Sequence, residues 1–155
     1  MPARIASFAA LESAAPEFGA AARRLFVGAD GVAIGFLATV SERGRPHLAP
    51  VCPVFCGDDL FVVASARSPR TADLRTNTAF VLHAFLGQSD EEFQLAGRTV
   101  EIVSAPERAA VHAAIPFASF QRADPIFRLD VERALWVYWD CAGQPDTKAV
   151  RRRWP

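Results

Sequence analysis

Apolar residues along this chain fall in short runs. These runs are separated by segments that are polar or that contain glycine or proline. Runs of this kind, rich in aliphatic and aromatic residues, predict buried strands. We expect strands at 33–40, 46–55, 60–64, 79–86, 93–103, 126–131, 135–141 and 148–154, the pair 126–131 and 135–141 turning at Glu132-Arg133. The turns are mostly short, and no strand–helix–strand alternation is sustained. The pattern therefore predicts that six or seven of these strands form a closed antiparallel barrel.

Helical spacing of apolar residues appears at a few places between and before these strands. It predicts helices at 16–27, 69–76 and 106–114, and a shorter helix before Pro16. Residues 1–28 thus form an N-terminal helical segment, which we expect to pack on the outside of the barrel.

Two of the predicted strands carry residues that disturb a regular ladder. The 46–55 strand contains Pro46, Pro50 and Pro53, and proline cannot donate a ladder hydrogen bond. This strand should therefore be an edge, bent or bulged, with backbone groups free to meet a ligand. In the 93–103 strand, Gly97 marks a bulge or a close approach of backbones.

The junction between the 60–64 strand and the 69–76 helix has the features of an anion site. Ser68 stands where an N-cap is expected and Pro69 suits the first helical turn. Such a helix start leaves backbone N–H groups unpaired, and Arg67 and Arg70 bring two guanidinium groups to the same end. These groups would hold a phosphate. The alternative is an ordinary capped helix with solvated arginines.

Composition narrows the possible functions. The chain has 155 residues, 51% of them hydrophobic, and 17 basic residues balance 17 acidic ones. We expect one domain over 1–155, no nucleic-acid partner and no membrane span. Three cysteines argue against a disulfide framework, and the histidines have no metal-ligand spacing. The start of the chain lacks the apolar run of a signal peptide, so a cytoplasmic location is expected.

Four segments, in this order, resemble the pyridoxamine 5′-phosphate oxidase-like, FMN-binding split-barrel family. The resemblance covers about Arg24 to Val103 well, and the ending at 126–139 more loosely. The segments are GFLATVSERGRPHLAPV, DDLFVVASARSPRTADLRTNT, FVLHAF and DEEFQLAGRTVEIV.

The resemblance implies a mainly β fold, a six-stranded antiparallel Greek-key split β-barrel with peripheral helices. It also implies a homodimer with flavin mononucleotide (FMN) in a cleft between the subunits. By position, Ser68 and Arg70 would hold the phosphate, with Arg67 nearby. The residues implied along the flavin are Val63, Ala64 and Ser65, together with the backbone at Pro50 and Val51.

The chain also departs from the family pattern. Glu92 stands close to the expected ring edge, where pyridoxamine phosphate oxidases often carry an amide. Related split barrels take a deazaflavin or heme, and heme is less expected because the C-terminal region contains no histidine to serve as an axial ligand. The resemblance favours an FMN-dependent oxidoreductase with a small-molecule substrate, although no catalytic side chain stands out. A deazaflavin-dependent reductase and a flavin-binding or sensing module without turnover remain the alternatives.

Overall fold

The computed structural model describes residues 7–117 and 120–155. Residues 1–6 of the predicted N-terminal segment lie outside them. The helices are α1 (Phe8–Ala14), α2 (Pro16–Phe26), α3 (Pro69–Thr76) and α4 (Ala105–Ala114), with a short 3-10 turn η1 (Gln88–Asp90). The strands are β1 (Gly35–Val40), β2 (Pro46–Val51), β3 (Val54–Cys56), β4 (Asp59–Val63), β5 (Ala79–Ala84), β6 (Glu92–Glu101), β7 (Ile126–Asp140) and β8 (Lys148–Trp154).

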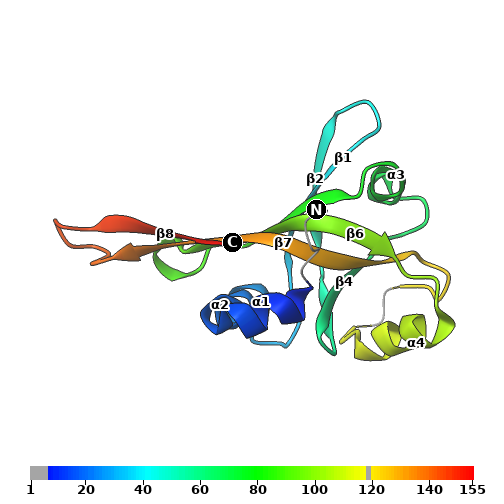
Figure 1. The fold of residues 1–155 in the computed structure, drawn as a ribbon, viewed down its shortest axis with the longest axis horizontal. Helices are drawn as coiled ribbons and strands as arrows, with labels where there is room; N and C mark the ends of the chain where they lie inside the picture. Colours follow the sequence, from blue (N-terminus) through cyan, green and yellow to red (C-terminus); the bar gives the residue numbers. More distant parts are fainter. Residues whose placement is uncertain (1–6, 118–119) are drawn as a thin grey trace.

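All the strand pairs are antiparallel, and the strands form one curled sheet (Figure 1). Their order is β2-β1-β5-β6-β7-β4-β3, and β8 also pairs with β7. The two edge strands β2 and β3 are consecutive in the chain, with only Cys52 and Pro53 between them. The barrel is therefore split: a bend in the chain, and not a ladder, joins its two edges.

The proline-rich segment behaves as predicted. It lies at an edge of the sheet and breaks into β2 and β3 at Pro53. Within β2, Pro46 lies opposite Val40 and Pro50 lies opposite Phe36. A strand without these two N–H groups cannot be paired fully on both sides, which explains its edge position. The break is one reason why the described residues show eight strands and not six or seven.

The predicted turn at Glu132-Arg133 is wrong, because β7 runs through it as one strand of 15 residues. The register shifts there: Ala96 pairs with Arg133, but Gly97 pairs with Val131, so Glu132 is the extra residue of a bulge. A Cβ at Gly97 would lie 2.0 Å from the carbonyl oxygen of Asp130. Gly97 is thus the close-approach point that the sequence predicted.

The main core lies between the inner face of the sheet and helices α1 and α2, which Figure 1 shows side by side below the sheet. Phe93 of β6 contacts both Phe18 and Phe26 of α2, with ring centroids 6.3 and 6.1 Å apart. A smaller cluster joins α4 to the sheet and consists of Val54, Phe61, Val63, Ile102, Val111 and Ile126. Within the described residues, none of the helices has both the length and the apolar character needed to cross a bilayer.

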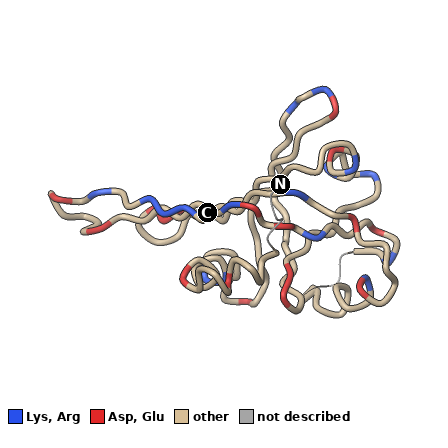
Figure 2. The backbone as a smooth tube through the Cα atoms, viewed as in Figure 1, with Lys and Arg blue, Asp and Glu red and all other residues tan. Residues whose placement is uncertain are grey.

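Strands β7 and β8 form a two-stranded ribbon that extends beyond the rest of the sheet (Figure 1). The pairing of β6 with β7 ends at Val137, whereas the pairing of β8 with β7 continues to Asp140. Basic residues follow one another along β8, at Lys148 and at 151–153 (Figure 2). The sheet therefore carries a positively charged strand beside β7.

Candidate functional site

The start of α3 is built as the sequence predicted. Ser68 is the N-cap, and its Oγ accepts a hydrogen bond from the backbone N–H of Arg70 at 3.3 Å. Pro69 occupies the first helical position and Asn77 ends the helix. This cap fixes the direction in which α3 leaves the end of β4.

The turn between β4 and α3 is tightly hydrogen-bonded. The carbonyl oxygen of Ser65 accepts from the Ser68 N–H at 2.9 Å and from the Thr71 hydroxyl at 2.8 Å. The expectation of unpaired amides is not met here, because the N–H groups of Ala66, Arg67 and Arg70 have partners. Those partners lie at 3.4, 3.4 and 3.3 Å, the long end of hydrogen-bond geometry. The acceptors for Arg67 and Arg70 are the Ser65 and Ser68 hydroxyls, which an anion could replace, whereas the acceptor for Ala66 is the Asp124 carboxylate.

Arg70 turns back over β2. Its Nη1 donates to the carbonyl oxygen of Pro50 at 3.1 Å, and its Nε donates to Ser68 Oγ at 3.4 Å. Both acceptors are neutral, and among the described residues no carboxylate pairs with this guanidinium. Burial lowers the pKa of Arg70 from its ordinary value. The site thus holds a half-buried cation whose charge nothing in the described chain balances.

The structure brings together three of the predicted residues, Pro50, Ser68 and Arg70. Two others lie close in the chain: Ser65 is exposed in the turn, and Arg67 is exposed with no ion-pair partner in the described part of the chain. This arrangement leaves the Arg67 guanidinium available to a ligand at the start of α3.

The other predicted residues are placed differently. The side chains of Val51, Val63 and Ala64 are buried, so only their backbones could face a ligand. The Ala64 N–H already donates to the carbonyl oxygen of Pro125 at 3.1 Å. Glu92 begins β6, three strands from β2 in the sheet, which corresponds to about 14 Å. Within one chain it does not reach the Arg70 cluster.

Sequence reasoning missed Asp73, which holds α3 in place. Its Oδ2 accepts a hydrogen bond from the Thr39 hydroxyl at 2.6 Å and lies 2.7 Å from Nδ1 of His47. The Asp73 side chain is buried, with 5% of its surface exposed. These contacts join α3 to β1 and β2, the strand that carries Pro50. The signal that could have identified Asp73 was its charge at a position one turn after Arg70, on the side of the helix that faces the sheet.

Glu91 was also missed, although its neighbour Glu92 was singled out. The Glu91 carboxylate accepts two hydrogen bonds from Arg24, at 2.8 and 2.6 Å, and one from Trp136 Nε1 at 2.8 Å. The hydrogen bond from Arg24 is the main cause that lowers the Glu91 pKa. Glu91 thus fastens α2 and β7 to the start of β6 and acts in the framework of the fold.

No protein-family model and no curated protein matches the chain. Solved structures do match, and their descriptions name several kinds of protein. An FMN-binding protein related to pyridoxamine 5′-phosphate oxidase, from Nostoc punctiforme, is 14% identical, with a TM-score of 0.59 over 92% of this chain and 96% of that one. A NimC/NimA family protein from Clostridium acetobutylicum is 12% identical, with a TM-score of 0.61 over 94% of each chain.

A heme-binding protein from Mycobacterium smegmatis is 21% identical, with a TM-score of 0.57 over 84% of this chain. This chain spans 57% of the length of that protein. At such identities the likeness concerns the fold, and it agrees with the split, curled sheet and its peripheral helices. The chain therefore has the split-barrel fold of the pyridoxamine 5′-phosphate oxidase-like, FMN-binding proteins, as its four sequence segments predicted.

Proposed function

We propose that this protein binds FMN and acts as a flavin-dependent oxidoreductase on a small-molecule substrate, with residues 1–155 forming one cofactor-binding domain. The observation that carries the proposal is the half-buried Arg70 guanidinium, whose hydrogen-bond acceptors among the described residues are the neutral oxygens of Pro50 and Ser68. A guanidinium that is partly removed from water and has no opposite charge beside it favours the binding of an anion. A phosphate placed there would balance the charge and complete the site.

In this proposal the phosphate contacts the Arg70 guanidinium, the Ser68 hydroxyl and the amides that follow Ser68, and Arg67 assists from the exposed side. The helix N-terminus adds a favourable field for an anion. The flavin lies along Ser65 and the backbone at Pro50, Val51, Val63 and Ala64. Glu92, which is too distant to touch the phosphate, belongs at the ring end of the cofactor.

Bound flavin supplies hydride or electron transfer, and the residues of this chain only bind and orient it. A deazaflavin with a phosphate group would use the same contacts. A flavin sensor without turnover would need no residues beyond those that bind the cofactor. The heme-binding neighbour shares the fold and adds no argument for heme in this chain.

We also propose a homodimer whose interface borders the cofactor. Phe36 and Phe85 are exposed on the outer side of the sheet, and their ring centroids lie 4.8 Å apart. Leu48 on β2 is 68% exposed, two residues from Pro50, and Pro50 lies opposite Phe36 in the β1–β2 ladder. A second copy of the chain covering this apolar patch would close the cleft next to the phosphate site.

The three cysteines, Cys52, Cys56 and Cys141, all lie in the described residues and are all free. Free thiols are typical of a reducing compartment, so we propose a cytoplasmic location.

A reoxidation experiment tests the oxidoreductase part of this proposal. The flavin-loaded protein is reduced with a nicotinamide nucleotide, and flavin absorbance is followed while candidate small molecules are added. An oxidoreductase is expected to reoxidise faster with at least one of them than with oxygen alone. If the rate equals that of oxygen for the whole set, the sensor alternative replaces the enzyme.

A further inference from the structure

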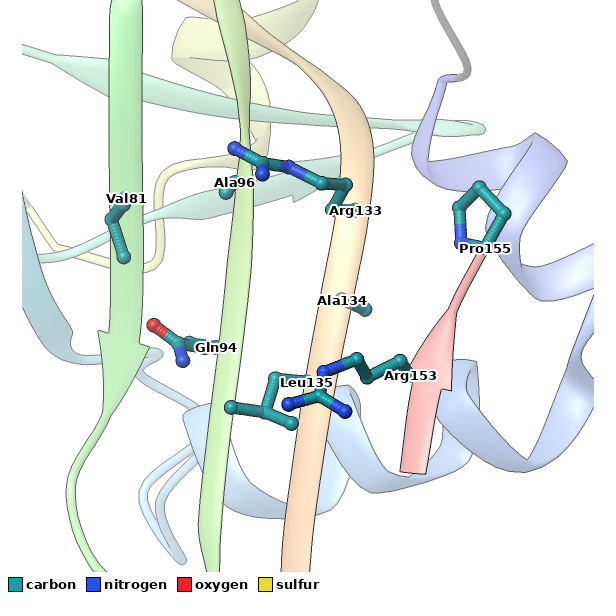
Figure 3. A pocket seen from close by; sticks show the side chains of 8 residues that line it. All are labelled: Val81, Gln94, Ala96, Arg133, Ala134, Leu135, Arg153 and Pro155. Atoms are coloured by element: carbon teal, nitrogen blue, oxygen red, sulfur yellow. The ribbon is translucent and has the colours of Figure 1, made fainter. Parts of the chain in front are cut away.

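A cavity of about 500 Å³, which we call the α4 cavity, lies beside α4, at the end of the molecule away from the tip of the β7–β8 ribbon (Figure 1). Helix α4 packs on β3, β4 and the start of β7. The proposed dimer patch lies on other parts of the sheet, on β1, β2 and the end of β5. The hollow over β5 to β8 in Figure 3 is on the outer face of the sheet and belongs to that interface. The α4 cavity is therefore a separate place on the molecule.

Short side chains along one edge of α4 explain the hollow. Ala105, Ala109 and Ala113 follow one another at intervals of four residues, so they lie along one side of the helix, and all three line the cavity. Val103, just before the helix, is 86% exposed and borders the same cavity. The methyl groups of alanine leave room that longer side chains would fill. The cavity therefore has an apolar wall that is open to solvent.

Two arginines form a charged wall of the cavity. The Nη2 group of the half-buried Arg108 donates to the carbonyl oxygens of Arg122 and Asp124, at 2.7 and 2.8 Å. These bonds hold the segment that carries Arg122 against α4, and the exposed Arg122 lines the cavity beside Arg108. In the described part of the chain, neither guanidinium lies within ion-pair distance of a carboxylate. Two cations without a counterion favour the binding of an anion.

Polar groups of this wall also have hydrogen-bonding capacity to spare. A guanidinium has five N–H donors, and the bonds of Arg108 to Ile102, Arg122 and Asp124 use at most three of them. His112 lies one turn further along α4 and also lines the cavity. Its Nε2 is buried and has no hydrogen-bond partner among residues 7–117 and 120–155, which is rare in folded proteins. The imidazole can turn about its Cβ–Cγ bond, so a ligand in the cavity could meet this nitrogen.

We propose that the α4 cavity binds a carboxylic acid with a small apolar body. Arg108 and Arg122 hold the carboxylate, since a guanidinium matches its charge and its planar geometry. His112 donates one further hydrogen bond, and the row of alanines contacts the apolar body together with Val103. The volume lies within the roughly 300–1,000 Å³ of ligand pockets. The proposal does not rest on the proposed flavin site.

Calorimetric titration of the full-length protein without flavin tests the proposal. The ligands are benzoate and hexanoate, and the comparison probes are acetate, which lacks the apolar body, and benzyl alcohol, which lacks the charge. At least one of the two acids should bind more tightly than both probes. Ala109→Leu should weaken that binding by about tenfold or more, because the longer side chain occupies the cavity. Ala110→Leu is the matched control, because Ala110 is the next residue, is exposed and does not line the cavity.

The charged wall is tested with Arg122→Gln. This change should weaken the binding of the acid by about tenfold, the effect of losing one charge-assisted hydrogen bond. Arg151→Gln, which removes the same charge at an exposed position on β8, should not. Arg108 is left unchanged because its bonds to carbonyl oxygens hold the wall together. All four substituted side chains are exposed, so the thermal midpoints of the variants should equal that of the wild type and exclude unfolding as a cause.

Three results would overturn the proposal: neither acid binds, one of the probes binds as tightly as the acids, or a control variant weakens binding as much as its counterpart. The Arg70→Ala variant adds a fourth. If it abolishes acid binding while Ala109→Leu leaves the binding intact, the acid occupies the proposed phosphate site and not the α4 cavity. Because the titrations contain no flavin, their failure would leave the FMN proposal untouched.

Discussion

The Arg70 guanidinium donates to the carbonyl oxygen of Pro50 at 3.1 Å, across 20 residues of sequence. This contact joins the first turn of α3 to the edge strand β2. Pro50 can take part because the edge strand leaves its carbonyl group accessible, and Arg70 can reach it because the Ser68 cap sets the direction of α3. The proposed phosphate site thus lies where a strand edge meets the start of a helix.

The first prediction concerns Ser68. Ser68→Ala should cost about 1 kcal/mol of stability, because the N-cap hydrogen bond to the Arg70 N–H is lost. It should also weaken FMN binding, because the hydroxyl contacts the phosphate in our proposal. Urea denaturation and FMN titration measure the two effects.

Ser104→Ala is the control for this prediction. Ser104 is the N-cap of α4, but its side chain makes no capping hydrogen bond. We expect it to change neither quantity. Equal effects of the two substitutions on FMN binding would contradict the role given to Ser68.

The second prediction concerns the buried carboxylate of Asp73. Asp73→Ala should destabilise the fold by about 1–3 kcal/mol, because the buried Thr39 hydroxyl loses its acceptor. It should also weaken FMN binding, since α3 is no longer held against β1 and β2. A double-mutant cycle with Thr39→Val isolates the pair, and we expect a coupling of at least about 0.5 kcal/mol. Additive effects would show that the two residues act separately.

The third prediction is a pH dependence. The hydrogen bonds from Arg24 lower the Glu91 pKa below its usual 4.5 in the folded protein. The stabilisation is therefore fully present above pH 4.5 and is lost as the pH falls through the lower, folded-state pKa. In Glu91→Gln the free energy of unfolding should fall less steeply with acidification over that range. Denaturation curves between neutral and acidic pH measure both slopes, and parallel slopes would contradict the assignment.

The fourth prediction concerns the dimer. Leu48→Asp places a charge in the exposed patch with Phe36 and Phe85, and it should convert a dimer to a monomer in sedimentation experiments. Val103→Asp is the control, because Val103 is 86% exposed but lies beside α4. A wild-type monomer at micromolar concentration, or dissociation by both substitutions, would contradict the proposed interface.

Much of the fold could be predicted because its signals are local. Ser68, Pro69 and Asn77 set the limits of α3 to the residue, and Gly97 marked the bulge. The interruption at Glu132-Arg133 was misread because a polar pair inside an apolar run has the composition of a turn. Only the partner strand shows that Glu132 is a bulge residue.

The site could be predicted less completely because the residues that hold it in place are far apart in the sequence. Asp73 and Thr39 are 34 residues apart, and Glu91 and Arg24 are 67 residues apart. Neither pairing leaves a periodic trace in the sequence. The cluster of Ser68 and Arg70 was visible because both residues lie on one helical turn. The backbone at Pro50 was also indicated by the sequence, and only its contact with Arg70 required the fold.

The most direct test of the phosphate site is the titration of apo-protein with FMN and with riboflavin, which lacks the phosphate, for the wild type, Arg70→Ala and Arg75→Ala. Arg75 lies on the same helix but pairs with Glu101 at 2.7 Å, so it serves as the control. The wild type should bind FMN more tightly than riboflavin. Arg70→Ala should weaken FMN binding by about ten- to a hundredfold and leave riboflavin binding unchanged, whereas Arg75→Ala should alter neither. Equal affinity of the wild type for FMN and riboflavin, or normal FMN binding by Arg70→Ala, would contradict the phosphate site.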